Sequence, residues 1–257
     1  MKVFVLERKN IVFYSVMLIA AMCVVCANWT GSLSVFSENA QNGGLPIYCV
    51  DKGDEKICAI SFDAAWGNED TEILIDILDE YDVKTTFFVV GSWVDKYPES
   101  VKALHDAGHE VMNHSDSHPH MTHLPVDNMK KEVQGCDEKI EKITGEKPFL
   151  FRPPYGDYDS KVIDTLADLG HYTIQWSVDS LDWKDLTSEQ ITERVTSNIH
   201  PGAIVLFHNA AKNTPEALPK ILKKLKDDGY KIVPISEIIM RDNYKIDHTG
   251  KQTEKTS

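Results

Sequence analysis

The chain has 257 residues, of which 42% are hydrophobic and 26% charged, and its formal net charge is −13. This length can hold one large α/β domain or two small ones, with a sizeable core in either case. The acidic balance argues against nucleic acid as a partner, because the chain offers no basic stripe for phosphates.

The N-terminus combines a basic flank with an apolar run. Residues 1–10 carry three basic side chains, Lys2, Arg8 and Lys9. The segment 11–27 is uncharged and almost wholly apolar. A run of this length reaches the lower limit for a membrane-spanning helix. We therefore expect a transmembrane anchor over 11–29, with a signal peptide cleaved near Ala27 as the alternative. Either way the flank stays in the cytoplasm and the rest is exported, membrane-anchored or secreted.

The remainder divides into a stalk, one patterned region and a tail. Residues 30–45 are polar and predict a stalk, whereas 241–257 are polar and unpatterned and are expected to be disordered. Between 46 and 240, strand-length apolar runs alternate with segments of helical period and no linker interrupts them, which predicts an α/β fold of parallel βαβ units closing like a barrel in a single domain. The strand-length runs are 56–62, 85–90, 109–112, 149–151, 173–176, 203–207 and 231–233, and the helical patterns lie at 71–81, 101–107 and 221–225.

Five cysteines are too few for a disulfide scaffold. Cys49 and Cys58 flank the turn-rich stretch VDKGDEK, which suggests a hairpin. A cross-strand disulfide between them is geometrically possible, and two small half-buried thiols fit the pattern equally well.

Unusual polar residues follow the predicted strands. In α/β barrels the chemistry lies where strands end, at their carboxyl edges. Five side chains occupy such positions: Asp63, His114, Arg152, Asp179 and His208. A buried carboxylate such as Asp63 costs several kcal/mol unless a partner compensates its charge.

The stretch NHSDSHPH carries the sharpest signal. His114 and His118 are four residues apart, and on one helical turn this spacing places both imidazoles on one face, as a divalent metal requires. Pro119 would stop the helix after that turn. Surface or capping histidines in a polar loop are the alternative, but four of the ten histidines fall within 114–123. We expect a metal site here.

Three further segments offer groups for catalysis. In FLFRPPYG, Arg152 is a natural partner for a carboxylate, and the two prolines would hold the Tyr155 N–H as in an oxyanion hole, although the segment alone fits a plain turn. VDSLDW offers Asp179 and Asp182, and IVLFH ends in His208. A histidine at the end of an apolar strand is commonly a satisfied core group, but an orienting carboxylate makes it a candidate general acid.

The segments SFDAAWG, HSDSHP, RPPYG, DSLDW and LFH, in this order, resemble the motifs of the polysaccharide deacetylases (carbohydrate esterase family four) over about residues 55–240. The resemblance implies a distorted (β/α) barrel with seven or eight parallel strands. It also implies hydrolysis of N-acetyl groups on amino sugars of peptidoglycan, chitin or related polymers, with one divalent metal, usually zinc. A peptidoglycan glycan strand is the expected partner.

The same resemblance assigns roles to single residues. Asp63, kept ionised by the metal and Arg152, would deprotonate the attacking water. The Tyr155 N–H would stabilise the oxyanion, and His208 would protonate the leaving amine. His208 would be oriented by one of two carboxylates, Asp179 being favoured and Asp182 left on the substrate side. Trp183 and Leu206 would enclose the acetyl methyl group.

The chain departs from the family pattern at one position. The family has two adjacent aspartates in its first motif, the second a metal ligand, and this chain has Ala64 there. The third ligand would then be water or a carboxylate of Glu69 or Asp70, and zinc binding would be weaker. The form F-D-x-x-W-G and the N-terminal apolar segment resemble a sporulation subgroup. A catalytically weak or inactive peptidoglycan-binding protein is therefore the alternative to an enzyme.

Overall fold

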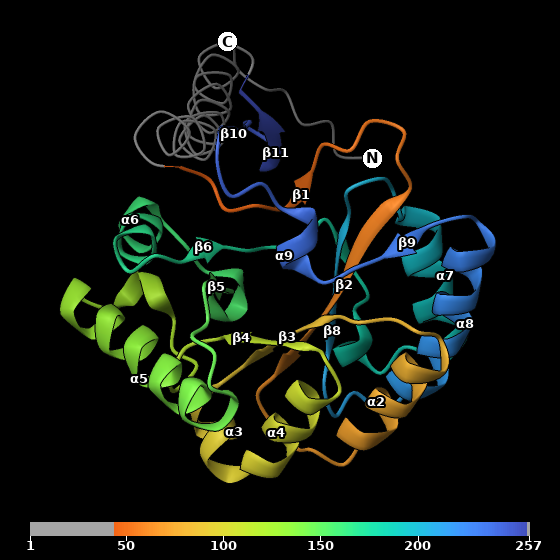
Figure 1. Cartoon of the computed structure of the whole chain (residues 1–257), viewed down its shortest axis with the longest axis horizontal. Helices are drawn as coiled ribbons and strands as arrows, with labels where there is room; N and C mark the ends of the chain where they lie inside the picture. The colour runs from red at the N-terminus through yellow and green to blue at the C-terminus, as the bar shows by residue number, and fades with distance from the viewer. Residues whose placement is uncertain (1–43, 256–257) are drawn as a thin grey trace, which may run out of the picture. The chain divides into compact units, whose positions relative to one another are not determined.

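The computed structural model describes residues 44–255 (Figure 1). The predicted cytoplasmic flank, the anchor and nearly all of the stalk lie outside the described residues. Within the part that is described, no helix has the length and apolar character needed to cross a membrane.

The described residues form alternating strands and helices. The strands are β1 (Cys49–Val50), β2 (Ile57–Ala64), β3 (Thr86–Val89), β4 (Glu110–Asn113), β5 (Leu150–Phe151), β6 (Tyr172–Thr173), β7 (Val178–Asp179), β8 (Ile204–His208), β9 (Lys231–Ile232), β10 (Tyr244–Ile246) and β11 (Lys251–Glu254). The α-helices are α2 (Thr71–Glu80), α3 (Gly91–Lys96), α4 (Pro98–Asp106), α5 (Val126–Thr144), α6 (Ser160–Asp168), α7 (Ser188–Asn198), α8 (Thr214–Asp227) and α9 (Ile235–Ile238). Single 3₁₀ turns are η1 (Met121–His123), η2 (Pro154–Gly156) and η3 (Asp182–Lys184).

A parallel sheet forms the centre of the domain. Its strands are hydrogen-bonded in the order β6-β5-β4-β3-β2-β8-β7, and β9 adds to β2. These seven strands make a half-barrel, and Figure 1 shows helices α2 to α8 around its outside. The α/β single domain predicted from the alternation of elements is confirmed, and the predicted strands match β2 to β6, β8 and β9 closely.

The alternation of side chains along β2 separates two cores. Ile60 and Phe62 pack with Leu74 and Leu78 of α2 on the helix side of the sheet. Ala59, on the opposite face, packs with the inner cluster that includes residues of α9. Because successive side chains point to opposite faces of a strand, Asp63 lies on the inner face with Ala59.

The segment predicted to be a disordered tail is ordered as far as residue 255, so that prediction is wrong. β10 and β11 pair antiparallel, and β11 pairs parallel with β1, giving a second, three-stranded sheet. Only Gln252 of β11 is fully buried. The segment therefore shows no alternation of apolar residues that would predict a strand.

The predicted hairpin between β1 and β2 does not form. β1 pairs with β11 and not with β2, so Cys49 and Cys58 are not cross-strand neighbours, and both are buried free thiols. Burial raises the pKa of Cys58 to about 12. Of the two alternatives, a disulfide and two free thiols, the structure has the free thiols.

Candidate active site

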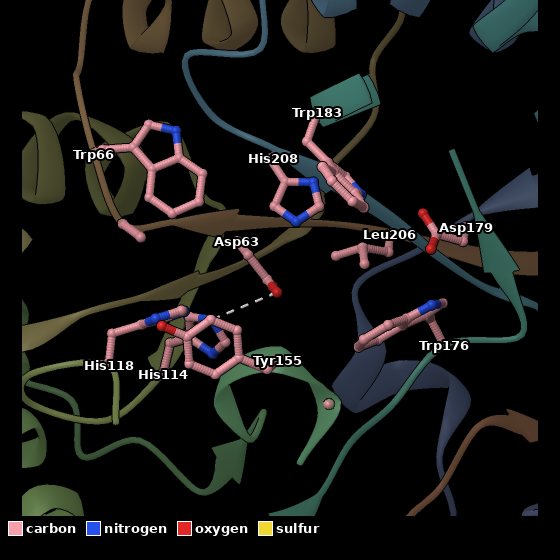
Figure 2. Close-up of a pocket in the computed structure, with 12 residues that line it drawn as sticks. Asp63, Trp66, His114, His118, Tyr155, Trp176, Asp179, Trp183, Leu206 and His208 are labelled. Atoms are coloured by element: carbon pink, nitrogen blue, oxygen red, sulfur yellow. Dashed lines mark ion pairs between the residues drawn. The ribbon is translucent and has the colours of Figure 1, made fainter. Parts of the chain in front are cut away.

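The carboxyl ends of the parallel strands gather polar side chains around one pocket. Asp63 of β2 lies directly opposite His208 of β8 in the sheet register. His114 and Arg152 follow β4 and β5 at once, where Asn113 pairs with Phe151. The pocket has a volume of about 500 Å³, in the range of small-molecule sites. Figure 2 shows ten of its twelve lining residues with labels: Asp63, Trp66, His114, His118, Tyr155, Trp176, Asp179, Trp183, Leu206 and His208.

Asp63 is compensated by Arg152, as the sequence predicts. The Arg152 guanidinium donates from Nη1 to Asp63 Oδ1 at 2.7 Å and from Nη2 to Ser61 Oγ at 2.8 Å, and it lies 4.2 Å from the centre of the Phe88 ring. Burial alone would raise the pKa of Asp63, but the charge and hydrogen bond of Arg152, together with His114 and His208, hold that pKa below its ordinary value. The carboxylate is therefore ionised, with Oδ2 left for other partners.

His114 and His118 come together, but through a loop instead of the expected helical turn. The described chain has no helix between β4 and η1, and Ser115 and His118 have φ of 69° and 60°. Asn113 Oδ1 accepts from the Ser115 N–H at 2.7 Å, and Ser115 Oγ accepts from the His118 N–H at 2.9 Å. These bonds stabilise the left-handed turns and place the two rings 5.0 Å apart.

Both imidazoles are neutral, so each can offer a nitrogen lone pair to a metal. Burial lowers the pKa of His114, and burial together with the His114 ring lowers the pKa of His118 to about 4. The distance from His114 Nδ1 to the Arg152 carbonyl is 2.7 Å, so Nδ1 carries the proton and Nε2 keeps its lone pair, 3.6 Å from Asp63 Oδ2. This protonation pattern suits metal ligation by His114.

The donor set for a metal is nonetheless incomplete. Within residues 44–255, no group of three histidine, cysteine, aspartate or glutamate side chains is arranged to hold an ion. Ala64 is fully buried in the helix-side core, and neither Glu69 nor Asp70 lines the pocket. Glu69 Oε2 accepts from the Asn68 N–H and Asp70 Oδ2 from the Ala210 N–H. Two imidazoles fit a metal as ligands, while the proposed carboxylate third ligands do not.

His208 is oriented by Asp182, and the preference for Asp179 is wrong. Asp182 Oδ1 lies 2.8 Å from His208 Nδ1, and Asp182 Oδ2 accepts from the His208 backbone N–H at 2.9 Å and from Thr214 Oγ1 at 2.8 Å. Asp182 is 3% exposed and does not line the pocket, so it is not a substrate-side group either. Burial alone would lower the pKa of His208, but the bond and charge of Asp182, together with the charges of Asp63 and Asp179, raise it above its ordinary value.

Trp183 and Leu206 line the pocket as the sequence predicts, and Tyr155 and Asp179 line it as well. Tyr155 has φ 60°, and its N–H has no acceptor among the described residues, as an oxyanion donor requires. Asp179 Oδ1 accepts from the Leu181 N–H at 2.9 Å, which ties this carboxylate to its own turn.

Two tryptophans of the pocket were missed by sequence reasoning. Trp66 and Trp176 both line it, and Trp66 is 53% exposed. Trp66 belongs to the first motif and lies two residues after Ala64, the last residue of β2. A large aromatic residue directly after a buried strand was the available signal. Nothing in the sequence around Trp176 distinguishes it from a core residue.

Comparison with known proteins places this site in a family. The family model described as polysaccharide deacetylase matches residues 51–174. The chain is 36% identical over 196 residues to the uncharacterized protein YlxY of Bacillus subtilis, covering 76% of this chain and 60% of YlxY. It is 32% identical to the peptidoglycan-N-acetylmuramic acid deacetylase PdaA of Bacillus subtilis over 231 residues, covering 85% of this chain and 88% of PdaA.

A solved structure gives the same result. BA3943 of Bacillus anthracis, described as a CE4 family pseudoenzyme, is 38% identical with a TM-score of 0.73, and the match covers 76% of this chain and 69% of BA3943. The half-barrel fold agrees with these similarities, which cover 76% to 85% of this chain. The chain belongs to the polysaccharide deacetylase family, carbohydrate esterase family four.

Proposed function

We propose that this protein is a hydrolase that removes N-acetyl groups from amino sugars of peptidoglycan. The observation that carries the proposal is the pairing of two opposed catalytic groups in one pocket. Asp63, held ionised by Arg152, supplies a base, and His208, bound to Asp182, supplies an acid. Similarity to a peptidoglycan deacetylase over most of both chains supports the glycan substrate.

The reaction follows from these positions. Asp63 Oδ2 accepts a proton from water as the water oxygen attacks the acetamide carbonyl carbon. The Tyr155 N–H donates a hydrogen bond to the oxygen that becomes negative. The C–N bond then breaks with its electron pair going to nitrogen, and His208 Nε2 gives its proton to the leaving amine. Acetate and a free amino sugar are the products.

We propose that His114 and His118 hold one divalent metal ion. We expect this ion to be Zn²⁺, because imidazole nitrogen is a common zinc ligand. When bound, the ion polarises the acetamide carbonyl. CE4 deacetylases are generally metal-dependent, and the two neutral imidazoles support the assignment. Because a third protein ligand is lacking among the described residues, we expect the affinity to be lower than that of a three-ligand site.

The rim of the pocket supports a carbohydrate ligand. Tyr155 and Trp183 are 62% and 54% exposed, whereas most large apolar side chains of the domain are buried. Exposed aromatic faces beside convergent polar groups favour a ligand with both apolar faces and hydroxyl groups, and a pyranose ring has both. The N-terminal apolar segment, outside the described residues, supports an extracytoplasmic domain anchored at the membrane, with a role in spore or cell-wall formation as the accompanying proposal.

A second candidate function is peptidoglycan binding without hydrolysis. It is favoured by the incomplete donor set for a metal and by the similarity to a CE4 pseudoenzyme. It is opposed by Asp63, Arg152, Asp182 and His208, which are costly buried or half-buried polar groups that binding alone does not need.

The deciding experiment measures acetate release from purified peptidoglycan by the full-length chain, with and without added Zn²⁺, together with zinc binding by calorimetry. We expect zinc-stimulated release that Asp63→Asn abolishes, and zinc binding that His114→Ala weakens. Glycan binding without acetate release under every divalent metal would favour the second candidate. Release that survives both substitutions would contradict the catalytic assignment.

A further inference from the structure

The exposed indole of Trp66 lies against the catalytic histidine. We propose that Trp66 is a positioning residue that holds the His208 imidazole in the orientation needed for proton transfer. This inference rests on the proposed function only for the role of His208 as the acid. The ring arrangement itself is independent of any activity.

The Trp66 ring lies beside two histidines of the site. It is nearly parallel to the His208 imidazole, with 11° between the planes and 6.4 Å between the ring centroids. It lies edge-on to His118, with 78° between the planes and the same centroid distance. Figure 2 shows His208 between Trp66 on one side and Trp183 on the other. Centroid distances of 4.5–7 Å are those of interacting aromatic pairs.

Asp182 and Trp66 restrict different motions of the imidazole. Asp182 holds one edge of the ring through Nδ1, at 2.8 Å, which fixes the tautomer and leaves Nε2 for the substrate. A single hydrogen bond at one edge still allows the ring to rock about it. The indole is parallel to the imidazole and offset sideways, with 6.4 Å between the centroids, so it bounds the ring on one side and limits rocking toward Trp66.

The backbone that carries Trp66 is held by Asn209, the residue after His208. Asn209 is 2% exposed, and its Nδ2 donates to the carbonyls of Trp66 and Gly67, both at 2.7 Å. Its Oδ1 accepts from the Ala65 N–H at 3.2 Å, and its backbone N–H donates to the Asp63 carbonyl at 3.0 Å. Three of these bonds tie the loop after β2 to Asn209, and the fourth joins β2 itself to the same residue.

Gly67 completes this attachment. It has φ +63°, and a Cβ there would lie 2.8 Å from the Ala210 Cβ, so the loop turns back against β8 only with glycine. The Trp93 Nε1–H also donates to the Gly67 carbonyl. Because Trp66 and His208 are fixed to one hydrogen-bonded unit, their relative placement is built into the fold and does not depend on substrate.

The chemistry gives this role a specific signature. The nitrogen of an amide leaves as an amine only when it receives a proton as the C–N bond breaks, and His208 Nε2 delivers that proton. An aryl ester such as p-nitrophenyl acetate leaves as a stable phenolate and needs no such proton. Loss of a positioning residue for the acid must therefore slow amide hydrolysis and spare ester hydrolysis, whereas general damage to the site slows both.

The experiment compares acetate release from N-acetylated peptidoglycan with hydrolysis of p-nitrophenyl acetate, using the full-length chain. For Trp66→Ala we expect kcat on the amide to fall roughly 3- to 10-fold, the size of one aromatic pair, with kcat on the ester unchanged. Trp66→Phe should recover most of the loss. Trp183→Ala, in the same pocket, should instead raise KM for the glycan. Equal losses on both substrates for Trp66→Ala would overturn the proposal.

A second measurement separates this inference from the proposed hydrolysis. The His208 Nδ1–H signal, observed by ¹⁵N-resolved NMR, reports how firmly Asp182 holds the ring. We expect its exchange with solvent to be faster in Trp66→Ala than in the wild type and in Trp183→Ala. An unchanged exchange rate would overturn the positioning role even in a chain without hydrolase activity, and faster exchange would support it there.

Discussion

Asp63 and Arg152 form a buried ion pair that explains how a carboxylate can stay charged at the end of an apolar strand. Arg152 is fully buried and Asp63 is 7% exposed. Removing both charges from water costs several kcal/mol, which their attraction and the bonds to Ser61 and the Gln175 carbonyl offset. The charge on Asp63 is thus a property of the folded residue pair.

Arg152→Gln leaves the Asp63 charge buried without its partner. We expect the free energy of unfolding to fall by about 3–5 kcal/mol, measured by urea denaturation at pH 7. The double variant Asp63→Asn/Arg152→Gln removes both charges and should recover part of the loss. A single variant as stable as the wild type would contradict this account.

The His208–Asp182 bond predicts a pH dependence. His208 must be protonated to act as the acid, so activity falls as pH rises through its pKa, which lies above the ordinary value because of Asp182. Asp63 must be ionised, and its lowered pKa keeps the acid limb of the profile low. We expect Asp182→Asn to move the alkaline limb of kcat/KM toward lower pH.

Asp179→Asn is the matched control for this profile. Its charge also raises the pKa of His208, but it follows Asp182 and Asp63 among the causes and makes no hydrogen bond to the ring. We expect a smaller shift of the same sign. An alkaline limb that moves equally in both variants would mean that Asp182 has no special role.

At this scale the sequence identified most pocket residues and the partner of Asp63, but not the partner of His208. Asp179 is the last residue of β7, and Asp182 lies three positions later, at the start of η3. The choice between them depends on Leu181, whose φ of 52° turns the chain so that Asp182 passes next to His208. A left-handed leucine has no sequence signal, because β-region or helical backbone is its ordinary preference.

Among the elements, strands that lie in apolar runs were predictable, including the two-residue strands β5, β6 and β9, whereas β7, β10 and β11 were not. All eight residues of β2 are buried, and such an apolar run is unmistakable. β7 has two residues, and β10 and β11 bury few side chains. These elements are held by pairing with distant strands, and local periodicity carries no information about such pairing.

β11 is nevertheless part of the folded domain, and Gln252 tests it. Its side chain is fully buried, with Oε1 accepting from the Met240 N–H and Nε2 donating to the Met240 carbonyl, both at 2.8 Å. We expect Gln252→Ala to lower the free energy of unfolding by about 2 kcal/mol, about 1 kcal/mol for each lost bond.

The measurement is urea denaturation, and Glu254→Ala on the same strand is the control. Glu254 is exposed, so its truncation should leave stability nearly unchanged. If Gln252→Ala had the same midpoint of urea unfolding as the wild type, β11 would not contribute to the stability of the domain.

For the whole molecule, the parallel order of strands explains why five distant segments meet. Every strand from β6 to β7 in the central sheet runs the same way, so all carboxyl ends lie at one edge. The sequence order of these ends alone therefore predicts a shared site. What no pattern of strands predicts is the left-handed loop that joins His114 to His118.

The net charge of −13 adds a prediction about the substrate. Peptidoglycan carries free carboxylates on its stem peptides, so protein and polymer repel each other at long range. Salt screens this repulsion, with a Debye length of about 10 Å at 0.1 M ionic strength. We expect binding to peptidoglycan to strengthen about twofold or more between 10 and 150 mM NaCl, measured by co-sedimentation.

An uncharged chitin oligosaccharide provides the matched control, because it offers the same N-acetylated sugar without carboxylates. Its binding, followed by quenching of tryptophan fluorescence in the pocket, should not depend on salt. If binding to peptidoglycan weakened as salt increased, attraction between the polymer and a cationic surface would dominate over repulsion. In that case a bound metal ion, and not the acidic net charge of the chain, would govern the encounter with the wall.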